Sequence, residues 1–181
     1  MLKKTIRNYF LALCLTLFCG DLLAAGTATR TISVSASVSQ ICSITTTTAL
    51  AFAVYDPVGT NATVPLNATG QISVACAKGS ASMTIGMGDG AHVNGSQRQM
   101  VGLTSNNFLQ YSIFQPPSNA ENTICTFPGT IAWSNVGAGM LTLTSAPAKT
   151  ARVYNVCGTI AAGQDVSVDT YLDTVTASIN F

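Results

Sequence analysis

The sequence predicts an all-β domain, built as an antiparallel sandwich or barrel. Two observations support this prediction. Short segments in which apolar residues alternate with Ser, Thr or Asn recur along the chain, and clusters of turn-forming residues separate them. The composition agrees, because 8% of residues are charged and 48% are hydrophobic, which suits strands with hydroxyl-bearing outer faces better than helices with Glu and Lys surfaces.

The expected strands follow one another at short intervals. In the first, residues 30–38, one face carries Ile32, Val34, Ala36 and Val38 and the other carries Thr and Ser. In the last, residues 174–181, Val175, Ala177, Ile179 and Phe181 share one face. Between them, strands are expected at residues 71–77, 83–87, 108–114, 124–133, 140–143 and 151–156. Turns are expected at residues 56–57, 67–70, 94–95, 116–119 and 137–139.

Residues 1–25 have the pattern of a secretory signal peptide. Lys3, Lys4 and Arg7 precede a short apolar run, and small residues end at Ala25, where cleavage is expected. The apolar run is too short for a comfortable membrane span, so we expect an exported chain without stable membrane insertion, an uncleaved anchor being the alternative. Removing these residues, which also include Asp21, changes the net charge from +1 to about −1. Such a chain has no basic face for nucleic acid.

Four cysteines remain after cleavage, and an even number in an exported chain indicates disulfides. Three pairings are possible. We favour Cys42–Cys76 and Cys125–Cys157, because each pair links neighbouring segments of the chain. A metal site is the alternative, but the chain has no CxxC pair and His92 is its single histidine, so we expect none.

The position of the first strand admits two interpretations. Residues 30–38 follow the flexible segment 26–29 and precede the first remaining cysteine, Cys42. From periodicity alone, the simpler interpretation is that they form the first strand of the chain's own sandwich.

A series of short motifs resembles the spore coat protein U domain family, which includes subunits of archaic chaperone–usher pili. The series extends over nearly all of the chain after residue 25, and its closing segment, with the pattern Y-x-D-x-V-x-x-x-I-x-F, is the most specific. The motifs are F-x-x-Y-D-P (52–57), G-Q-I-S-V-A-C (70–76), G-D-G-A-H (88–92) followed by Arg98 and Met100, L-Q-Y-S-I-F (109–114), G-T-I-A-A-G-Q (158–164) and Y-L-D-T-V-T-A-S-I-N-F (171–181).

The resemblance implies an incomplete immunoglobulin-like β-sandwich that is completed by a donor strand from a neighbouring subunit. Residues 26–40 would be the donor segment, with Ile32, Val34, Ala36 and Val38 as the inserted side chains, and residues 41–181 the pilin-like domain. Val175, Ala177, Ile179 and Phe181 would form one lip of the receiving groove. Arg30 shares the inserted face, and we expect it at the groove mouth because burying an unpaired guanidinium is costly.

The implied function is that of a structural pilus subunit at the cell surface, supporting adhesion and biofilm formation. Its implied partners are identical or related subunits, a periplasmic chaperone and an outer-membrane usher. Two alternatives remain: a self-complemented secreted coat protein, whose own strand folds back into the groove, and a sugar-binding adhesin with a β-sandwich fold.

No motif indicates catalysis or a cofactor. Residues 86–90 are rich in glycine, but no helix pattern follows them, so we interpret them as a hairpin turn. No nucleophile and orienting acid lie near His92 in the sequence, which favours an isolated histidine in a turn. Asp165, Asp169 and Asp173 could bind calcium, but a solvated face is the favoured interpretation. We therefore predict that the protein is not an enzyme.

Overall fold

The structure is a computed structural model that describes residues 26–181 in two units. In the first unit, residues 26–37 are exposed and form no strand. The second unit, Val38–Phe181, is the folded body. The predicted signal peptide, residues 1–25, lies outside the described residues. Among residues 26–181, none belongs to a helix of the length and apolar character needed to cross a membrane.

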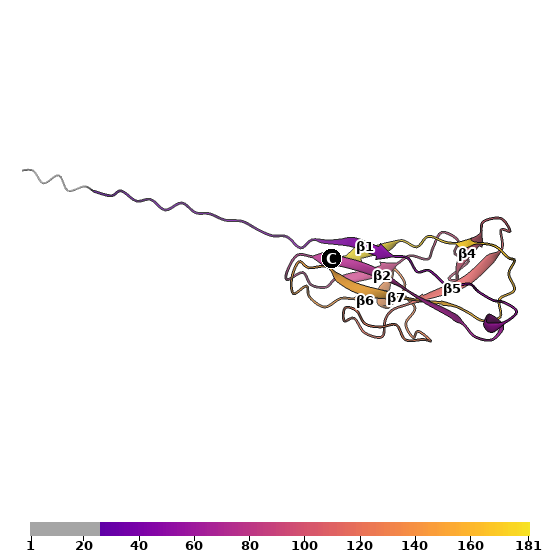
Figure 1. Ribbon diagram of the computed structural model, residues 1–181. Coiled ribbons are helices and arrows are strands. Elements are labelled where there is room, and N and C mark those ends of the chain that lie inside the picture. Colours follow the sequence, from indigo (N-terminus) through magenta and orange to yellow (C-terminus); the bar gives the residue numbers. More distant parts are fainter. Residues whose placement is uncertain (1–25) are drawn as a thin grey trace, which may run out of the picture. The chain divides into compact units, whose positions relative to one another are not determined.

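The body consists of two β-sheets with short 3-10 turns in the connections (Figure 1). A six-stranded sheet has the order β1-β2-β7-β5-β4-β8, and a three-stranded sheet has the order β6-β3-β9. All pairings between neighbouring strands are antiparallel. The elements are β1 (Cys42–Thr48), η1 (Thr60–Ala62), β2 (Leu66–Cys76), β3 (Thr84–Met87), β4 (Arg98–Gly102), β5 (Phe108–Phe114), η2 (Gly137–Gly139), β6 (Leu141–Thr142), β7 (Arg152–Ile160), β8 (Tyr171–Leu172) and β9 (Ala177–Asn180).

Alternation of apolar residues determines which face of each strand is buried. In β2, Ile72, Val74 and Cys76 point into the core, and β5 contributes a matching set. Trp133 is completely buried between the sheets, where its Nε1–H donates to the carbonyl of Ile85 in β3 at 2.8 Å. The buried core is completed by residues from both sheets and the loops between them: Met83, Met87, Leu109, Tyr111, Ile113, Leu141, Leu143, Ala146, Tyr154, Val156 and Ile160.

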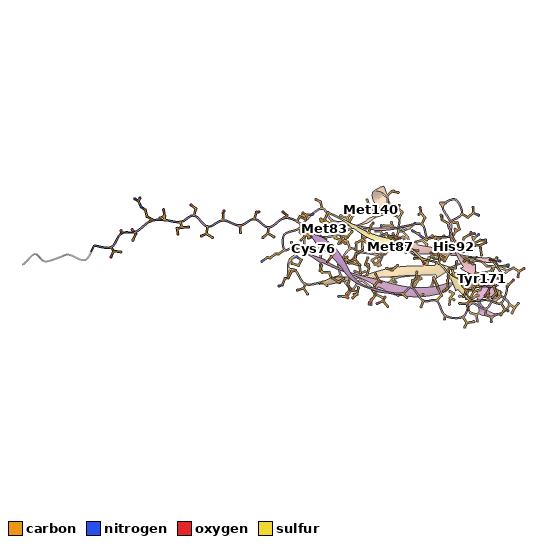
Figure 2. The ribbon with its side chains drawn as sticks, turned by 90° about the horizontal axis from the view of Figure 1, so that it is seen from above. Cys76, Met83, Met87, His92, Met140 and Tyr171 are labelled. Atoms are coloured by element: carbon orange, nitrogen blue, oxygen red, sulfur yellow. A yellow bond between two sulfur atoms is a disulfide. The ribbon has the colours of Figure 1, made fainter. Side chains whose placement is uncertain are left out.

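The body has two ends, which we call the root end and the far end. Figure 2 places Cys76 and Met83 toward one end and His92 and Tyr171 toward the other. The root end is where β1 begins and where the C-terminus lies, next to each other in Figure 1. The far end carries β4 and β8.

The turn predicted at residues 67–70 is wrong, because these residues belong to β2. Gly70 lies where the end of β1 approaches closely, and a Cβ at this position would lie 2.9 Å from the carbonyl oxygen of Thr48. Gly70 is therefore needed because another backbone approaches β2 closely at this position. In the sequence, such a glycine cannot be distinguished from one that marks a turn.

The strand predicted at residues 124–133 is also wrong over most of its length. Cys125 is held against β7 by its disulfide to Cys157, and the Pro128–Gly129 turn interrupts the segment. Pairing with β5 is restricted to the end of the segment, where Trp133 N–H donates to the carbonyl of Ile113 at 2.9 Å. The covalent link overrides the local β propensity.

Both predicted disulfides are confirmed. Cys42–Cys76 joins the first paired residues of β1 and β2 across a separation of 34 residues. Cys125–Cys157 ties the 115–133 loop to the outer side of β7 across 32 residues, and Cys157 is completely buried. Each bridge closes a loop that would otherwise add entropy to the unfolded chain.

The double substitution Cys125→Ser/Cys157→Ser is expected to lower the free energy of unfolding by about 3–4 kcal/mol, through the lost loop closure. Urea titration of the purified mature chain would measure this loss, with the fluorescence of the buried Trp133 as the signal. Reducing agent should change the unfolding curve of the wild type much more than that of a chain lacking all four cysteines. Equal stability of the double variant and the wild type would contradict a stabilising role for this bridge.

Candidate functional site

An apolar groove of about 1020 Å³ lies along the body, between two extended segments of the chain. Its floor is the core itself, formed by side chains of both sheets, and its lips are residues 44–57 and residues 166–177. The volume is at the upper limit for small-molecule pockets. Because the groove is bordered by two extended backbones, its form suits an extended peptide better than a compact ligand. The floor residues are Ile72, Met87, Met100, Leu109, Tyr111, Ile113, Val156 and Ile160.

The first lip has an unpaired backbone edge. Within the described residues, the backbone N–H and C=O groups of residues 49–54 form no hydrogen bonds. Leu50 and Phe52 nevertheless hold this segment on the body, because they pack against β7 at Gly158, where a Cβ would lie 2.6 Å from Leu50 Cδ2. Phe52 also contacts the ring of Tyr111 edge-on, with 6.4 Å between the ring centroids. The lip is therefore anchored by side chains and leaves its backbone free.

Two of the sequence motifs meet where the first lip ends. The hydroxyl of Tyr55 donates to the carbonyl of Ala161 at 2.9 Å and accepts from the backbone N–H of Gln164 at 2.9 Å. The side chain of Gln164 in turn accepts from the N–H of Gln110 at 2.8 Å and donates to its carbonyl at 2.9 Å. The F-x-x-Y-D-P and G-T-I-A-A-G-Q segments therefore fix the first lip to β5.

The second lip alternates between half-buried and exposed residues from Asp169 to Ala177. Its backbone is bonded on one side only. The carbonyl of Thr170 accepts from Leu103 N–H at 3.0 Å and that of Thr176 from Gly88 N–H at 2.8 Å, while β9 pairs with β3. The half-buried side chains of Tyr171, Val175 and Ala177 line the groove. The edge that faces the groove can accept another strand.

Asp173 is the polar anchor of the second lip, with a side chain only 3% exposed. Its carboxylate accepts from the Tyr111 hydroxyl at 2.5 Å and from the Ala91 N–H at 2.9 Å, and its Oδ1 lies 3.0 Å from Nδ1 of His92. Burial alone would raise the pKa of Asp173, but these hydrogen bonds, together with one from Thr174 N–H, outweigh it and lower the pKa. Burial and the hydrogen bond to Asp173 raise the pKa of Tyr111. The carboxylate is therefore held ionised within a network of donors.

Glycine is required beside this carboxylate. Gly90 has a φ of +90°, and a Cβ there would collide with the Asp173 oxygens. The G-D-G-A-H motif and the Tyr171–Phe181 motif are thus two halves of one contact, although His92 and Asp173 are 81 residues apart in sequence. The expectation of an isolated histidine is wrong, since the acid lies on another segment that only the fold brings near.

Arg98 holds the neighbouring backbone. Its guanidinium is buried and donates to the carbonyls of Met87 at 3.1 Å, Gly88 at 2.7 Å and Trp133 at 2.8 Å. Burial lowers the pKa of Arg98, whereas the charges of Tyr111, Asp89 and Asp173 act in the opposite direction. The planar guanidinium thus donates to two carbonyls where β3 ends and to a third, on Trp133, from another segment of the chain.

The three aspartates considered for calcium serve separate roles. Asp169 accepts from the N–H groups of Ser105 at 2.6 Å, Thr104 at 2.9 Å and Thr170 at 2.8 Å, and these bonds lower its pKa. Asp173 belongs to the network above, and Asp165 is exposed. Over residues 26–181, no three His, Cys, Asp or Glu side chains gather in a way that could hold a metal ion.

The residues predicted for the groove lip divide into two pairs. Val175 and Ala177 line the groove. Ile179 is half-buried and pairs with Ile85 in β3, and Phe181 is 54% exposed beyond the end of β9, so neither belongs to the groove lining. The first lip was not predicted, because its large apolar residues Leu50 and Phe52 alternate with alanines and not with polar residues.

The predicted donor residues lie in the exposed segment. Ile32 is 86% exposed, Val34 92% and Val38 88%, and Ala36 and Arg30 are exposed as well. Every described residue up to Ile41 is exposed. The alternating apolar face of residues 30–38 is therefore uncovered in this structure.

Together, the fold and the groove define a class of protein: an immunoglobulin-like β-sandwich that lacks one strand. A solved structure supports this fold. The body resembles a chain in the crystal structure of the CsuC–CsuE chaperone–tip adhesion subunit pre-assembly complex from the archaic chaperone-usher Csu pili of Acinetobacter baumannii, with a TM-score of 0.52 and 23% sequence identity. The match covers 80% of this chain and 41% of the matched chain, so it spans about two fifths of that chain's length.

The chain belongs to the Spore Coat Protein U domain family, whose family model matches residues 28–178. It is also 33% identical over 168 residues to Protein U of Myxococcus xanthus, and the alignment covers 87% of each chain. The predicted family and fold class are thereby confirmed.

The substitution Asp173→Asn is expected to destabilise the body by about 1–3 kcal/mol at neutral pH, because the network loses its charged acceptor. Since the pKa of Asp173 is lowered on folding, the stabilisation by its ionised form is present above the unfolded pKa of about 3.9 and is lost as the pH falls below it. Urea titrations from pH 6 to pH 3 should therefore bring the wild type and Asp173→Asn closer together. Asp165→Asn, at an exposed carboxylate, is the matched control. A constant difference across this range would contradict the argument.

Proposed function

We propose that this protein is a structural subunit of a surface pilus and that it polymerises by donor-strand exchange. In this proposal residues 30–38 of one copy insert into the groove of the next, with Ile32, Val34, Ala36 and Val38 directed at its floor. One observation carries the proposal. A groove with an apolar floor and a free backbone edge on its first lip occurs in the same chain as an exposed segment whose apolar face has the period of a strand.

The energetics favour such an exchange. Burying Ile32, Val34 and Val38, all more than 85% exposed here, contributes about 1.5–3 kcal/mol for each side chain. Hydrogen bonds to the free edges of the two lips add about 1 kcal/mol each. The loss of translational freedom and the ordering of the segment offset part of this gain. Dissociation would require the whole strand to leave the groove at once, which gives such a fibre kinetic stability.

The proposed partners follow from the same groove. An uncovered core and a free strand edge promote aggregation during export, so we infer that a periplasmic chaperone covers the groove before assembly and that an outer-membrane usher exchanges it for the next subunit. The resemblance to a subunit solved with its chaperone supports this part of the proposal. Export would be directed by the signal peptide, which would then be cleaved near Ala25. We extend the proposal to adhesion and biofilm formation, because the matched complex contains a tip adhesion subunit.

The substitution Val34→Arg is expected to abolish fibres, because it would place an unpaired charge on the groove floor. Ser35→Arg puts the same charge on the opposite face of the segment and should leave assembly intact. Electron microscopy of cells that express each variant as their single copy would measure the outcome, and biofilm mass should follow fibre number. Normal fibres from Val34→Arg would remove this segment from the interface.

Deleting residues 27–39 is expected to leave a body that binds its chaperone but does not polymerise. Adding a synthetic peptide of residues 28–40 should then give a one-to-one complex with a raised unfolding temperature, whereas the same peptide with Val34→Arg should not. Size-exclusion chromatography and thermal unfolding would measure both effects. A mature full-length chain that is a stable monomer in dilute solution, with its own segment in the groove, would instead support the self-complemented coat protein.

A further inference from the structure

We propose that an exposed apolar row at the far end of the body is a second interface, which packs against the root end of the neighbouring copy in the fibre. We define this row by Leu103 and Val101 of the β4 region, Phe108 of β5 and Leu172 of β8. The inference rests on the proposed function, because it concerns the contact that strand exchange imposes on the two bodies.

The length of the chain between donor segment and body requires such a contact. Val38 is the last side chain of the donor face, and Gln40, two residues later, is already fixed on its own body. The Gln40 side chain donates to the carbonyl of Ala81 at 3.0 Å and accepts from the Ala81 N–H at 3.4 Å. Two residues span at most about 7 Å. When Val38 lies in the groove of a neighbour, Gln40 on the donor's own body is therefore at most about 7 Å from that groove. At this distance the surfaces of the two bodies must touch.

The course of the chain selects the far end for this contact. The connection that follows Val38 joins the body at the root end, where β1 begins beside Met83 and β9. In a growing fibre each copy both receives a strand and extends its own. A neighbour seated at the root end would occupy the place from which the receiving copy's own segment must leave. The far end is free of this conflict, so Val38 of the incoming strand lies there.

The far end carries three exposed apolar side chains, Leu103, Phe108 and Leu172, around the half-buried Val101. Val101 pairs with Phe108 on one side and with Leu172 on the other, so the three side chains form one rung on the outer face of the sheet. Phe108 is 48% exposed and Leu172 52%, and Leu103, two residues beyond Val101, is 60% exposed. Large apolar residues gathered in this way on a sheet with an otherwise polar outer face mark an interaction surface. Leu172 also lines the groove, so the row is continuous with the proposed strand interface.

The root end offers a matching surface. Ile41 directly follows the anchored Gln40 and is 65% exposed. Phe181 is also exposed there, next to the pairing of Thr84 with Asn180. The short connection brings Ile41 of the incoming copy to the far end together with Val38. We therefore assign a second copy of this chain, through its surface around Ile41, as the occupant of the apolar row.

Photo-crosslinking in assembled fibres tests this assignment. A photoreactive benzoyl-phenylalanine replaces Leu103, which does not line the groove, and the control replaces Val136, which is 68% exposed on the loop before η2. After irradiation of purified fibres, the Leu103 position should give a ladder of covalent oligomers, at least tenfold stronger than the Val136 position. Peptide mapping should identify the partner residues as those around Ile41.

The outcomes separate this inference from the proposed function. Fibres that form normally but crosslink no more from position 103 than from position 136, or that crosslink from 103 to a different surface, would overturn the second interface and leave strand exchange standing. Unmodified chain that yields no fibres from its chaperone complex would overturn both. As an independent measurement, Phe108→Thr should shorten the half-life of fibres in denaturant several-fold, whereas Val136→Thr should not. An unchanged half-life for Phe108→Thr would also count against the interface.

Discussion

The organisation of this protein depends on one constraint: a backbone edge without hydrogen-bond partners lies beside an open apolar core. Residues 49–54 keep their N–H and C=O groups unpaired while Leu50 and Phe52 hold the segment in place. In a complete sandwich another strand would satisfy this edge and cover the side chains below it. Here both requirements remain at the same place, and one inserted strand would meet them together. The proposed exchange follows from that coincidence more than from any single residue.

The polar network around Asp173 makes an open groove compatible with a defined fold. An edge segment with few neighbours would be expected to fray, since its packing is incomplete on one side. Asp173 fixes the middle of the second lip through Tyr111, His92 and Ala91, while Arg98 satisfies the carbonyls where β3 ends. Asp173 and Tyr111 both line the groove, so this network also fixes the position of the second lip at the border of the space that an incoming strand would enter.

Much of the fold could be predicted from the sequence, because apolar and polar residues alternate along β2, β5 and β9 and so indicate which faces are buried. The disulfide pairing was also accessible, since each bridge joins segments that are close along the chain. Two predictions failed for one physical reason. Gly70 and the 124–133 segment are governed by contacts with distant parts of the chain, a backbone approach from β1 and a covalent link to Cys157, and local residue preferences carry no information about either.

The site could be predicted only in part, for a related reason. β1 was missed because Thr45 to Thr48 lack an apolar alternation, and because their pairing with β2 is shifted by one residue, between Ile44 and Thr46, from the register at Cys42. β4 was missed because an arginine such as Arg98 does not indicate a buried position in the sequence. Its burial depends on backbone carbonyls, such as that of Trp133, which come from distant residues and accept its hydrogen bonds. Motifs such as G-D-G-A-H could be recognised, but their purpose could not. Only the fold shows that Gly90 makes room for a carboxylate 83 residues further along the chain.

In the proposed exchange, the exposed segment supplies the strand that the groove of another copy lacks. A single strand of nine residues is not stable alone in water, so residues 30–38 would form a strand only by joining a sheet. Their Ser and Thr face keeps the segment soluble until then, and the same face would lie toward solvent after insertion into a groove. Within residues 31–38 neither face carries a charged side chain, so insertion of this segment into a groove would bury no charge.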